Sequence, residues 1–476
     1  MISAAFRSVL ASGLLLLALQ LSRSLAADLH VDFSRTNGLL RPLHGGNNGP
    51  LGYGELVDLT AFHRELAIPY TRLHDSAWPY PDIVDVHAVF PDFNADPARP
   101  ESYRFGPTDD YLRAITNTGA RIVYRLGESI EHAKRKRYVL PPPDAARWAA
   151  ICTGIIRHFN EGWANGQHLG IRHWEIWNEP ENRPAMWTGS PKEFYHLYST
   201  AAKTIKARWP ELKVGGPALG HLGEFRAETL KPSEFLRDFI DHIKTEGAAL
   251  DFFSWHTYTT NASVLRQRAR AVRQLLDSEG FRATESHLNE WNYLPDHDWG
   301  PMLSASGQTR ERWYARQGGA EGAAFAAAAL IELQDAPLDV ANYYSADNQP
   351  FGMFSFHGTP KKTFYAFKAF RALLDAPLRI AISGMQPGRL SASASVSTNR
   401  NEAMILLSDT SSSPGEHSLS GKNWPWPGGA LAEIFILDAT RNLERTRTER
   451  LPESAWKLQL QTQPPAVTWI RFRSAP

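Results

Sequence analysis

Two glutamates occur in similar settings, each beside an asparagine and near a tryptophan. Glu179 lies in the segment Trp-Asn-Glu-Pro (177–180), and Glu290 lies in the segment Leu-Asn-Glu-Trp-Asn (288–292). Cleavage of a glycosidic bond uses two carboxyl groups, one protonated to donate to the leaving oxygen and one ionised to act at the anomeric carbon. A separation of about 5–5.5 Å allows direct attack with retention, whereas roughly 6.5–9.5 Å admits a water and gives inversion. The pair indicates this chemistry, and the sequence leaves the separation open.

For both glutamates to act on one bound group, each must end a strand that opens into a shared site. Because side chains alternate along a strand, Glu179 is expected to share one direction with Glu175 and Trp177, and Asn178 to point the other way. Trp177 and Trp291 are the candidate apolar walls that, with a nearby second carboxylate, would raise the pKa of the acid.

The chain around these segments alternates short apolar runs with longer runs of helical period. Strands are predicted at Leu39–Gly46, Tyr70–Ser76, Arg121–Glu128, His173–Pro180, Leu212–Ala218, Asp251–Tyr258, Ser286–Asn292 and Val340–Asp347. Helices are predicted at Gly54–Ala67, Asp110–Thr118, Asp144–Glu161, Ser190–Trp209, Pro232–Glu246, Ala262–Gly280, Ala320–Leu333 and Lys361–Leu374. Eight strand–helix pairs favour an α/β fold, a (β/α)8 TIM barrel whose active site lies at the carboxyl ends of the strands. A doubly wound open sheet is the competing architecture, although no Gly-x-Gly-x-x-Gly or phosphate-loop pattern follows any of these strands.

After Pro377 the helical periodicity stops and short alternating runs appear, separated by Ser, Gly and Pro. These runs predict a C-terminal β-sandwich domain over residues 378–476, which is expected to have an accessory structural role. The barrel is assigned to residues 28–377, and its first segment, the strand-like 29–33, could pair with the sandwich.

Residues 1–27 have the pattern of a secretory signal peptide. Arg7 is followed by the short apolar run Leu10–Leu21 and then by small residues up to Ala27. About 20 apolar residues are needed to cross a bilayer, so cleavage is favoured over an uncleaved membrane anchor. The protein is therefore expected to be secreted or periplasmic.

Composition narrows the range of partners. Lys and Arg total 51 against 50 Asp and Glu, a balance that gives no reason to expect nucleic acid or an anionic membrane as partner. The single cysteine, Cys152, excludes an internal disulfide, and no Cys/His spacing typical of a metal site occurs. Proton transfer and carboxylate attack need no cofactor. The expected partner is an oligo- or polysaccharide, and the oligomeric state is left open.

Five ordered segments resemble one family. Residues 177–180 match the Asn-Glu-Pro of the large clan of retaining glycosidase barrels, and Glu-Trp-Asn at 290–292 is similar to the nucleophile motif of glycoside hydrolase family 39. Gly-Gly-Pro-Ala at 215–218, Asp-Phe-Phe-Ser-Trp-His-Thr-Tyr at 251–258 and the run at 360–367 resemble further segments of that family. The chain thus looks like a member of the β-xylosidase/α-L-iduronidase family over about residues 38–375.

The resemblance implies catalytic roles for three residues. Glu179 would be the general acid/base and Glu290 the nucleophile. Asn178 would hydrogen-bond the sugar 2-hydroxyl, a contact that strengthens in the transition state.

It also implies five supporting residues. His256 and Tyr258 would line the site and hold the nucleophile, and Trp291 would contact the substrate. Arg72 and His74 match an Arg-x-His at the end of the second strand, where Arg72 could keep the nucleophile ionised. Taken singly, His256 could equally be a core histidine and Arg72 part of a structural ion pair.

Three segments depart from the family pattern. Asn289 stands where the family usually has Thr, which should leave the chemistry intact. Residues 342–345 read Asn-Tyr-Tyr-Ser on the eighth strand, where the family commonly has a Trp, so the identity of the sugar is open. The Gly- and Asn-rich segment 44–50 could bind sugar hydroxyls or form a tight turn.

Three hypotheses for function follow. The first is a retaining, β-xylosidase-like exo-glycosidase. The second is an endo-acting enzyme of the same family on an exopolysaccharide, which an open cleft would favour. The third is a non-catalytic carbohydrate-binding protein, which the presence of both glutamates and Asn178 disfavours.

Overall fold

The computed structural model describes residues 27–475 except 53–56, 304–306 and 454–455. Eight parallel strands form a closed barrel in the order β11-β12-β13-β2-β5-β6-β7-β8, and β8 pairs with β11 to close it. The strands are β2 (Gly45–Asn47), β5 (Tyr70–Leu73), β6 (Arg121–Leu126), β7 (His173–Ile176), β8 (Lys213–Leu219), β11 (Phe252–Thr259), β12 (Glu285–Tyr293) and β13 (Val340–Tyr343). Closure confirms the predicted (β/α)8 barrel and rules out the open sheet.

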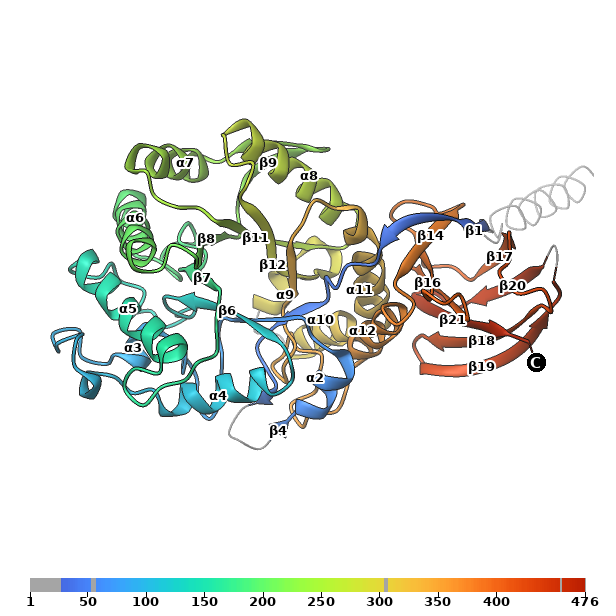
Figure 1. Cartoon of the computed structure of the whole chain (residues 1–476), viewed down its shortest axis with the longest axis horizontal. Coiled ribbons are helices and arrows are strands. Elements are labelled where there is room, and N and C mark those ends of the chain that lie inside the picture. The colour runs from blue at the N-terminus through green and yellow to red at the C-terminus, as the bar shows by residue number, and fades with distance from the viewer. Residues whose placement is uncertain (1–26, 53–56, 304–306, 454–455, 476) are drawn as a thin grey trace, which may run out of the picture. The chain divides into compact units, whose positions relative to one another are not determined.

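A helix follows each barrel strand and packs outside it, so that the helices surround the strands in Figure 1. These helices are α2 (Thr60–Leu66), α4 (Gly106–Thr116), α5 (Ala145–Glu161), α6 (Pro191–Arg208), α7 (Glu234–Glu246), α8 (Ser263–Ser278), α11 (Ala320–Glu332) and α12 (Lys362–Leu373). Local sequence sets several boundaries: Ser190 and Glu193 form a complete capping box at the start of α6, and Gly162 ends α5 with a left-handed φ.

Shorter elements decorate the loops of the barrel. They are β3 (Leu51–Gly52), β4 (Val57–Asp58), α3 (Val86–Val89), η2 (Pro100–Ser102), β9 (Gly223–Arg226), β10 (Thr229–Pro232), η3 (Pro295–His297), α9 (Gly300–Leu303), α10 (Gly307–Gly318) and η4 (Leu333–Asp335). Two of them matter below: the hairpin β9–β10 follows β8, and α9 and α10 follow β12.

The second compact unit is a nine-stranded sheet. Its strands are β1 (Ala27–Leu39), β14 (Leu378–Ser383), β15 (Leu390–Val396), β16 (Glu402–Asp409), β17 (Gly415–Lys422), β18 (Ala430–Leu437), β19 (Asn442–Leu451), β20 (Lys457–Thr462) and β21 (Ala466–Ser474). They are hydrogen-bonded in one order, β19-β18-β21-β16-β15-β14-β1-β17-β20. Trp456, just before β20, nevertheless contacts Phe472 of β21 in the other half of that order. The expected sandwich is therefore one continuous sheet folded over a common core.

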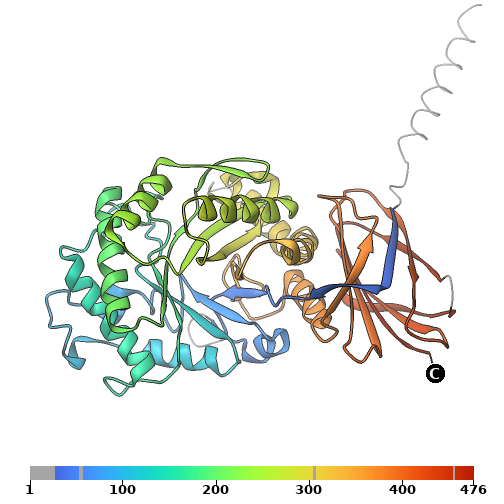
Figure 2. The same cartoon turned by 45° about the horizontal axis from the view of Figure 1, so that its top comes forward.

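The N-terminal strand belongs to this unit and not to the barrel. β1 pairs with β14 in antiparallel and with β17 in parallel, and Figure 2 shows it, in blue, among the orange and red strands. The barrel unit accordingly spans Leu40–Asp375, and the segment 29–33 pairs with the C-terminal strands, as the sequence allowed. Trp426 is buried and Trp424 packs against Phe33, so this pair helps to fill the core of the sheet.

The expected signal peptide falls on residues 1–26, which lie outside the described residues. Within the part of the chain that the structure describes, no helix combines the length and the apolar character needed to cross a bilayer.

Candidate active site

The end of β7 brings Asn178 and Glu179 to the barrel mouth together. β7 stops at Ile176, and the next residues leave the strand conformation, with a φ of 70° at Trp177 and 43° at Glu179. The strand alternation predicted for this segment therefore fails after Ile176, because left-handed residues reverse the side-chain direction. Trp177 turns away and packs against Trp148 and Trp187. It is a core residue and not a wall of the site.

Glu290 projects from β12 into the same mouth, and its side chain is almost buried. Strand alternation then sends Trp291 outward. Trp291 is fully buried between Tyr343 and Phe367, which corrects the expectation that it contacts substrate.

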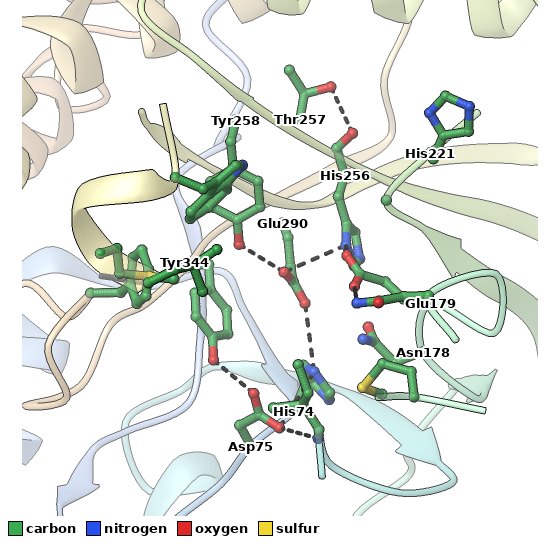
Figure 3. Close-up of a pocket in the computed structure, with 18 of the residues that line it drawn as sticks. His74, Asp75, Asn178, Glu179, His221, His256, Thr257, Tyr258, Glu290 and Tyr344 are labelled. Atoms are coloured by element: carbon green, nitrogen blue, oxygen red, sulfur yellow. Dashed lines mark hydrogen bonds and ion pairs between the residues drawn. The ribbon is translucent and has the colours of Figure 1, made fainter. Parts of the chain in front are cut away.

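His256 of β11 joins the two carboxyl groups. Its Nδ1 lies 2.8 Å from Glu179 Oε1 and 3.5 Å from Glu290 Oε2. One oxygen of Glu179, one of Glu290 and a His256 nitrogen all lie within 4.8 Å of one another. Figure 3 shows the two carboxylates on either side of the imidazole. The sequence placed His256 beside the nucleophile alone, and the structure places it between both glutamates.

Glu290 is held from two further sides. The Tyr258 hydroxyl donates to Glu290 Oε2 at 2.8 Å, and Arg72 Nη1 donates to Oε1 at 2.8 Å. Arg72 also donates through Nε to Glu175 at 2.6 Å and through Nη2 to Asn178 Oδ1 at 2.7 Å. This fully buried guanidinium therefore positions three side chains of the site at once.

The electrostatics of Glu179 differ from the expectation. Burial acts to raise its pKa, but the hydrogen bond and charge of His256, with help from Asn182 and Arg72, outweigh burial and lower the pKa below the usual value. Burial acts to lower the pKa of His256, but the charges of Glu290 and Glu179 raise it overall. Neither Trp177 nor Trp291, the two expected apolar walls, lines the pocket, and the imidazole beside the carboxylate decides the direction of the shift. Both shifts favour a carboxylate on Glu179 paired with an imidazolium on His256.

Across the barrel mouth, a cluster of polar residues lies at the end of β5. Asp75 follows His74 with a φ of 54°, accepts a hydrogen bond from the Ile130 amide, and accepts another from the Tyr344 hydroxyl at 3.0 Å. Burial raises the pKa of Asp75 to about 7. Burial, with the charges of Arg125 and Arg72, lowers the pKa of His74 well below its usual range, so that His74 is neutral.

These residues line one pocket of about 990 Å³ at the carboxyl ends of the strands (Figure 3). The volume lies at the upper end of the range for small-molecule sites. Its lining comprises His74, Asp75, Ile130, His132, Asn178, Glu179, Glu181, Asn182, Met186, Gly220, His221, His256, Thr257, Tyr258, Arg268, Glu290, Trp299, Met302, Leu303, Arg310, Tyr314, Tyr344 and Phe351. Every residue predicted to form the site lies here except Arg72, which acts from beneath, and Trp291.

Comparison with known proteins decides the family. The family model described as "Glycosyl hydrolases family 39" matches residues 84–386, more than half of the chain. The chain belongs to glycosyl hydrolase family 39. The matched region contains both glutamates and every strand of the site from β6 to β13.

Individual relatives are more distant. The chain is 28% identical over 269 residues to a β-xylosidase of Geobacillus stearothermophilus, which covers 50% of this chain and 49% of that protein. It is 25% identical over 279 residues to a β-xylosidase of Caldicellulosiruptor saccharolyticus, covering 53% and 51%. The chain thus matches about half the length of these curated relatives. A glucosidase structure from Croceicoccus marinus shares the fold, with a TM-score of 0.77, 24% identity and coverage of 95% of this chain and 100% of that one.

The segments that depart from the family 39 pattern have structural explanations. Asn289 donates to Glu175, so it supports the carboxylate that pairs with Arg72. In the Gly/Asn-rich segment, Asn47 accepts from Arg72 Nη1 at 3.1 Å and Asn48 donates to the His74 carbonyl oxygen. The segment braces the site from below and does not line the pocket. Tyr344 does line it, in place of the usual tryptophan.

Sequence reasoning missed two acids of this family 39 site. Asp75 directly follows the Arg-x-His of β5, and that adjacency was the available signal. Glu181, two residues after Glu179, accepts from the amides of Gly220 and His221. Burial and the charge of Glu179 raise the pKa of Glu181 to about 8, so that it carries a proton at neutral pH.

The donor atoms of Glu179, His256 and Glu290 are close enough together to hold a metal ion. Their present partners argue against that use, because the Arg72 guanidinium, 2.8 Å from Glu290, already supplies a positive charge there. In the cluster of His173, Glu285 and His287, each histidine is hydrogen-bonded to Glu285. Lys213 already supplies a positive charge to that carboxylate.

Proposed function

We propose that this chain is a retaining glycoside hydrolase with β-xylosidase-like exo action, in which Glu290 is the nucleophile and Glu179 the general acid/base. The observation that carries the proposal is the spacing of the two carboxyl groups, whose nearest oxygens lie within 4.8 Å. That spacing fits the arrangement of about 5–5.5 Å that retaining enzymes use and leaves too little room for the water of an inverting mechanism.

In the first step, Glu290 attacks the anomeric carbon while Glu179 protonates the departing oxygen. The proton of the Glu179–His256 pair moves from the imidazolium to the carboxylate over the 2.8 Å contact. Substrate binding favours this transfer, because removing water makes two neutral groups more stable than an ion pair. In the second step, Glu179 accepts a proton from water, and that water displaces Glu290 from the sugar.

The neighbouring residues have defined roles in these steps. Arg72 and Tyr258 hold both oxygens of Glu290, so the carboxylate is fixed in position before attack. Asn178 accepts from Arg72 through Oδ1, which leaves its Nδ2 to donate to the sugar 2-hydroxyl. That bond strengthens as charge develops at the anomeric carbon.

Covalent trapping tests the mechanism. Incubation with a 2-deoxy-2-fluoro-β-xyloside bearing a good leaving group should add one fluoroxylosyl unit, mapped to Glu290 by peptide mass spectrometry. Glu290→Gln is the matched control and should take up no label. A label on another residue, or an unchanged mass with every fluoroglycoside tested, would contradict the proposal.

Azide rescue tests the division of roles. Glu179→Ala should lose activity on substrates with poor leaving groups and, with azide, form a β-glycosyl azide of retained configuration. Glu290→Ala should form the α-azide instead, because azide then replaces the nucleophile. The reverse pattern would exchange the two roles.

The sugar and the mode of action are tested separately. Two relatives are β-xylosidases and one structural neighbour is a glucosidase, so matched aryl β-xylosides and β-glucosides should be compared first. Exo action predicts that xylo-oligosaccharides release xylose alone from the first minutes of reaction. Early release of longer fragments would favour the endo-acting alternative.

We also propose export to the periplasm or the medium, on the pattern of residues 1–27. N-terminal sequencing of the mature protein should begin near Ala27 or Asp28. A retained Met1 would contradict cleavage.

A further inference from the structure

Arg268 is a cation of the pocket that the mechanism does not use. It lies on α8, and its Nη1 donates to the Thr257 hydroxyl at 3.3 Å. Its guanidinium carbon lies 4.7 Å from the ring centroid of Phe225 in β9. Thr257 and Arg268 line the same pocket as Glu179 and His256.

Arg268 differs from the other arginines of its helix. The other three each form an ion pair with an acidic residue: Arg266 with Glu332, Arg270 with Glu228 and Arg273 with Asp277. Arg268 has no ion pair with any acidic side chain among the residues that the structure describes, and its buried Nε has no hydrogen-bond partner there. Burial lowers its pKa. A partly buried cation without an anion is costly, and a negatively charged ligand would remove that cost.

The location of Arg268 assigns it to the leaving group. Its contacts are on β11 and on the hairpin that follows β8, and β8 is the neighbour of β7, which carries Glu179. Asp75 and Tyr344 lie on the opposite side, after β5 and β13. In Figure 3, His221 of the β8 side lies beyond His256 and away from that polar group. Because Glu179 protonates the departing oxygen, the unit that departs lies on the β8–β11 side.

We propose that Arg268 binds the carboxylate of an acidic sugar in the leaving-group position, so that the preferred substrates are glycosides whose leaving group is a uronic acid. The proposal rests on the function proposed above. The fork of a guanidinium matches a carboxylate through two parallel hydrogen bonds. Stacking on Phe225 holds the plane of the fork in place.

The acids of the pocket do not oppose this assignment. The charges of Glu179 and Glu290 are balanced by His256 and Arg72. Glu181, on the same side as His221, carries a proton below about pH 8 because burial and Glu179 raise its pKa. An anionic leaving group therefore meets Arg268 without a facing unpaired carboxylate from these residues.

The test compares two β-xylosides that differ only at C6 of the leaving sugar, which is glucose in one and glucuronic acid in the other. At about pH 6 the glucuronate is ionised. Its kcat/KM should exceed that of the glucose compound roughly 10- to 100-fold, as expected for a hydrogen-bonded charge pair. Raising the ionic strength should reduce the ratio.

Variants separate recognition from a structural role. Arg268→Gln should remove the preference and leave the kcat/KM of the neutral substrate unchanged, whereas Arg268→Lys should keep part of it. Arg270→Gln, on the same helix but paired with Glu228, is the control and should change neither value. Equal rates for both substrates in the wild type, or an equal loss for both in Arg268→Gln, would overturn the proposal.

A binding measurement keeps this inference distinct from the proposed function. Calorimetric titration with methyl β-glucuronide should show binding that methyl β-glucoside lacks and that Arg268→Gln abolishes. If neither xyloside is cleaved, the proposed xylosidase activity fails, and this titration still decides the anion site. Equal binding of the two methyl glycosides would refute the anion site.

Discussion

Replacing Arg72 by methionine should destabilise the barrel and abolish turnover. Arg72 is fully buried and donates to Glu175 at 2.6 Å and to Glu290 at 2.8 Å. Methionine keeps much of the side-chain volume and removes the charge. Glu175 and Glu290 then remain buried without the cation that compensates them.

The magnitude follows from that burial. Removing one partner of a buried ion pair costs about 3–5 kcal/mol, because the remaining charge is desolvated and unpaired. For a barrel-sized unit this corresponds to a fall of roughly 5–10 °C in melting temperature. Turnover should fall as well, since Glu290 and Asn178 both lose the donor that positions them.

A second substitution makes the prediction sharper. In the wild type, Glu175→Gln removes the partner of a buried guanidinium and should lower stability. In the Arg72→Met background the same change removes an uncompensated buried carboxylate and should raise stability, by about 1–3 kcal/mol. The effect of one substitution therefore reverses in sign between the two backgrounds.

Thermal unfolding followed by circular dichroism, on the four proteins of this cycle at one pH, measures the reversal. Initial rates on an aryl β-xyloside show whether activity follows stability. If Glu175→Gln has the same sign in both backgrounds, or if Arg72→Met melts within about a degree of the wild type, Arg72 does not carry the electrostatic balance of the site.

Three further predictions test other contacts. Tyr258→Phe removes the donor to Glu290 and should lower kcat/KM roughly 10- to 100-fold, because a hydrogen bond to a charged group is worth about 1.5–3 kcal/mol; an unchanged kcat/KM would count against this contact. Asp75 has a folded pKa of about 7, raised from 3.8 by burial, so the fold loses stability as pH rises through that window. At pH 8, Asp75→Asn should therefore be more stable than the wild type, by up to about 4 kcal/mol in the free energy of unfolding. Near pH 4 the two proteins should have the same melting temperature. A difference that does not change with pH would show that loss of the Tyr344 contact dominates. Trp291→Phe should lower the free energy of unfolding by at least about 1 kcal/mol without changing KM. A raised KM with the stability of the wild type would show instead that Trp291 contacts the substrate.

Much of the fold followed from local pattern. The strand–helix alternation predicted the eight units of the barrel. Strands and helices differ in the spacing of their apolar residues, which repeats every two to four positions and can be read from the local sequence. The end of β7 escaped this reasoning. Alternation assumes a continuing strand, and the left-handed φ values of Trp177 and Glu179 reversed the side chains of that segment.

The C-terminal unit shows the same limit. Alternating runs predicted strands, but pairing partners are set by long-range hydrogen bonds that no local pattern records. β1 therefore joined β14 and β17, far along the chain, in one folded sheet.

The sequence alone predicted that Glu179 and Glu290 belong to two strand segments of one barrel, because strand patterns and motifs are local properties. Only the tertiary structure decided what surrounds them. Barrel closure brings Arg72 to Glu290 across 218 positions and His256 to Glu179 across 77. These contacts hold one oxygen of Glu179 and one of Glu290 within 4.8 Å of each other, raise the pKa of His256, and leave Arg268 without an acidic partner among the described residues. Charge and distance act through space, and the chain order does not encode them directly.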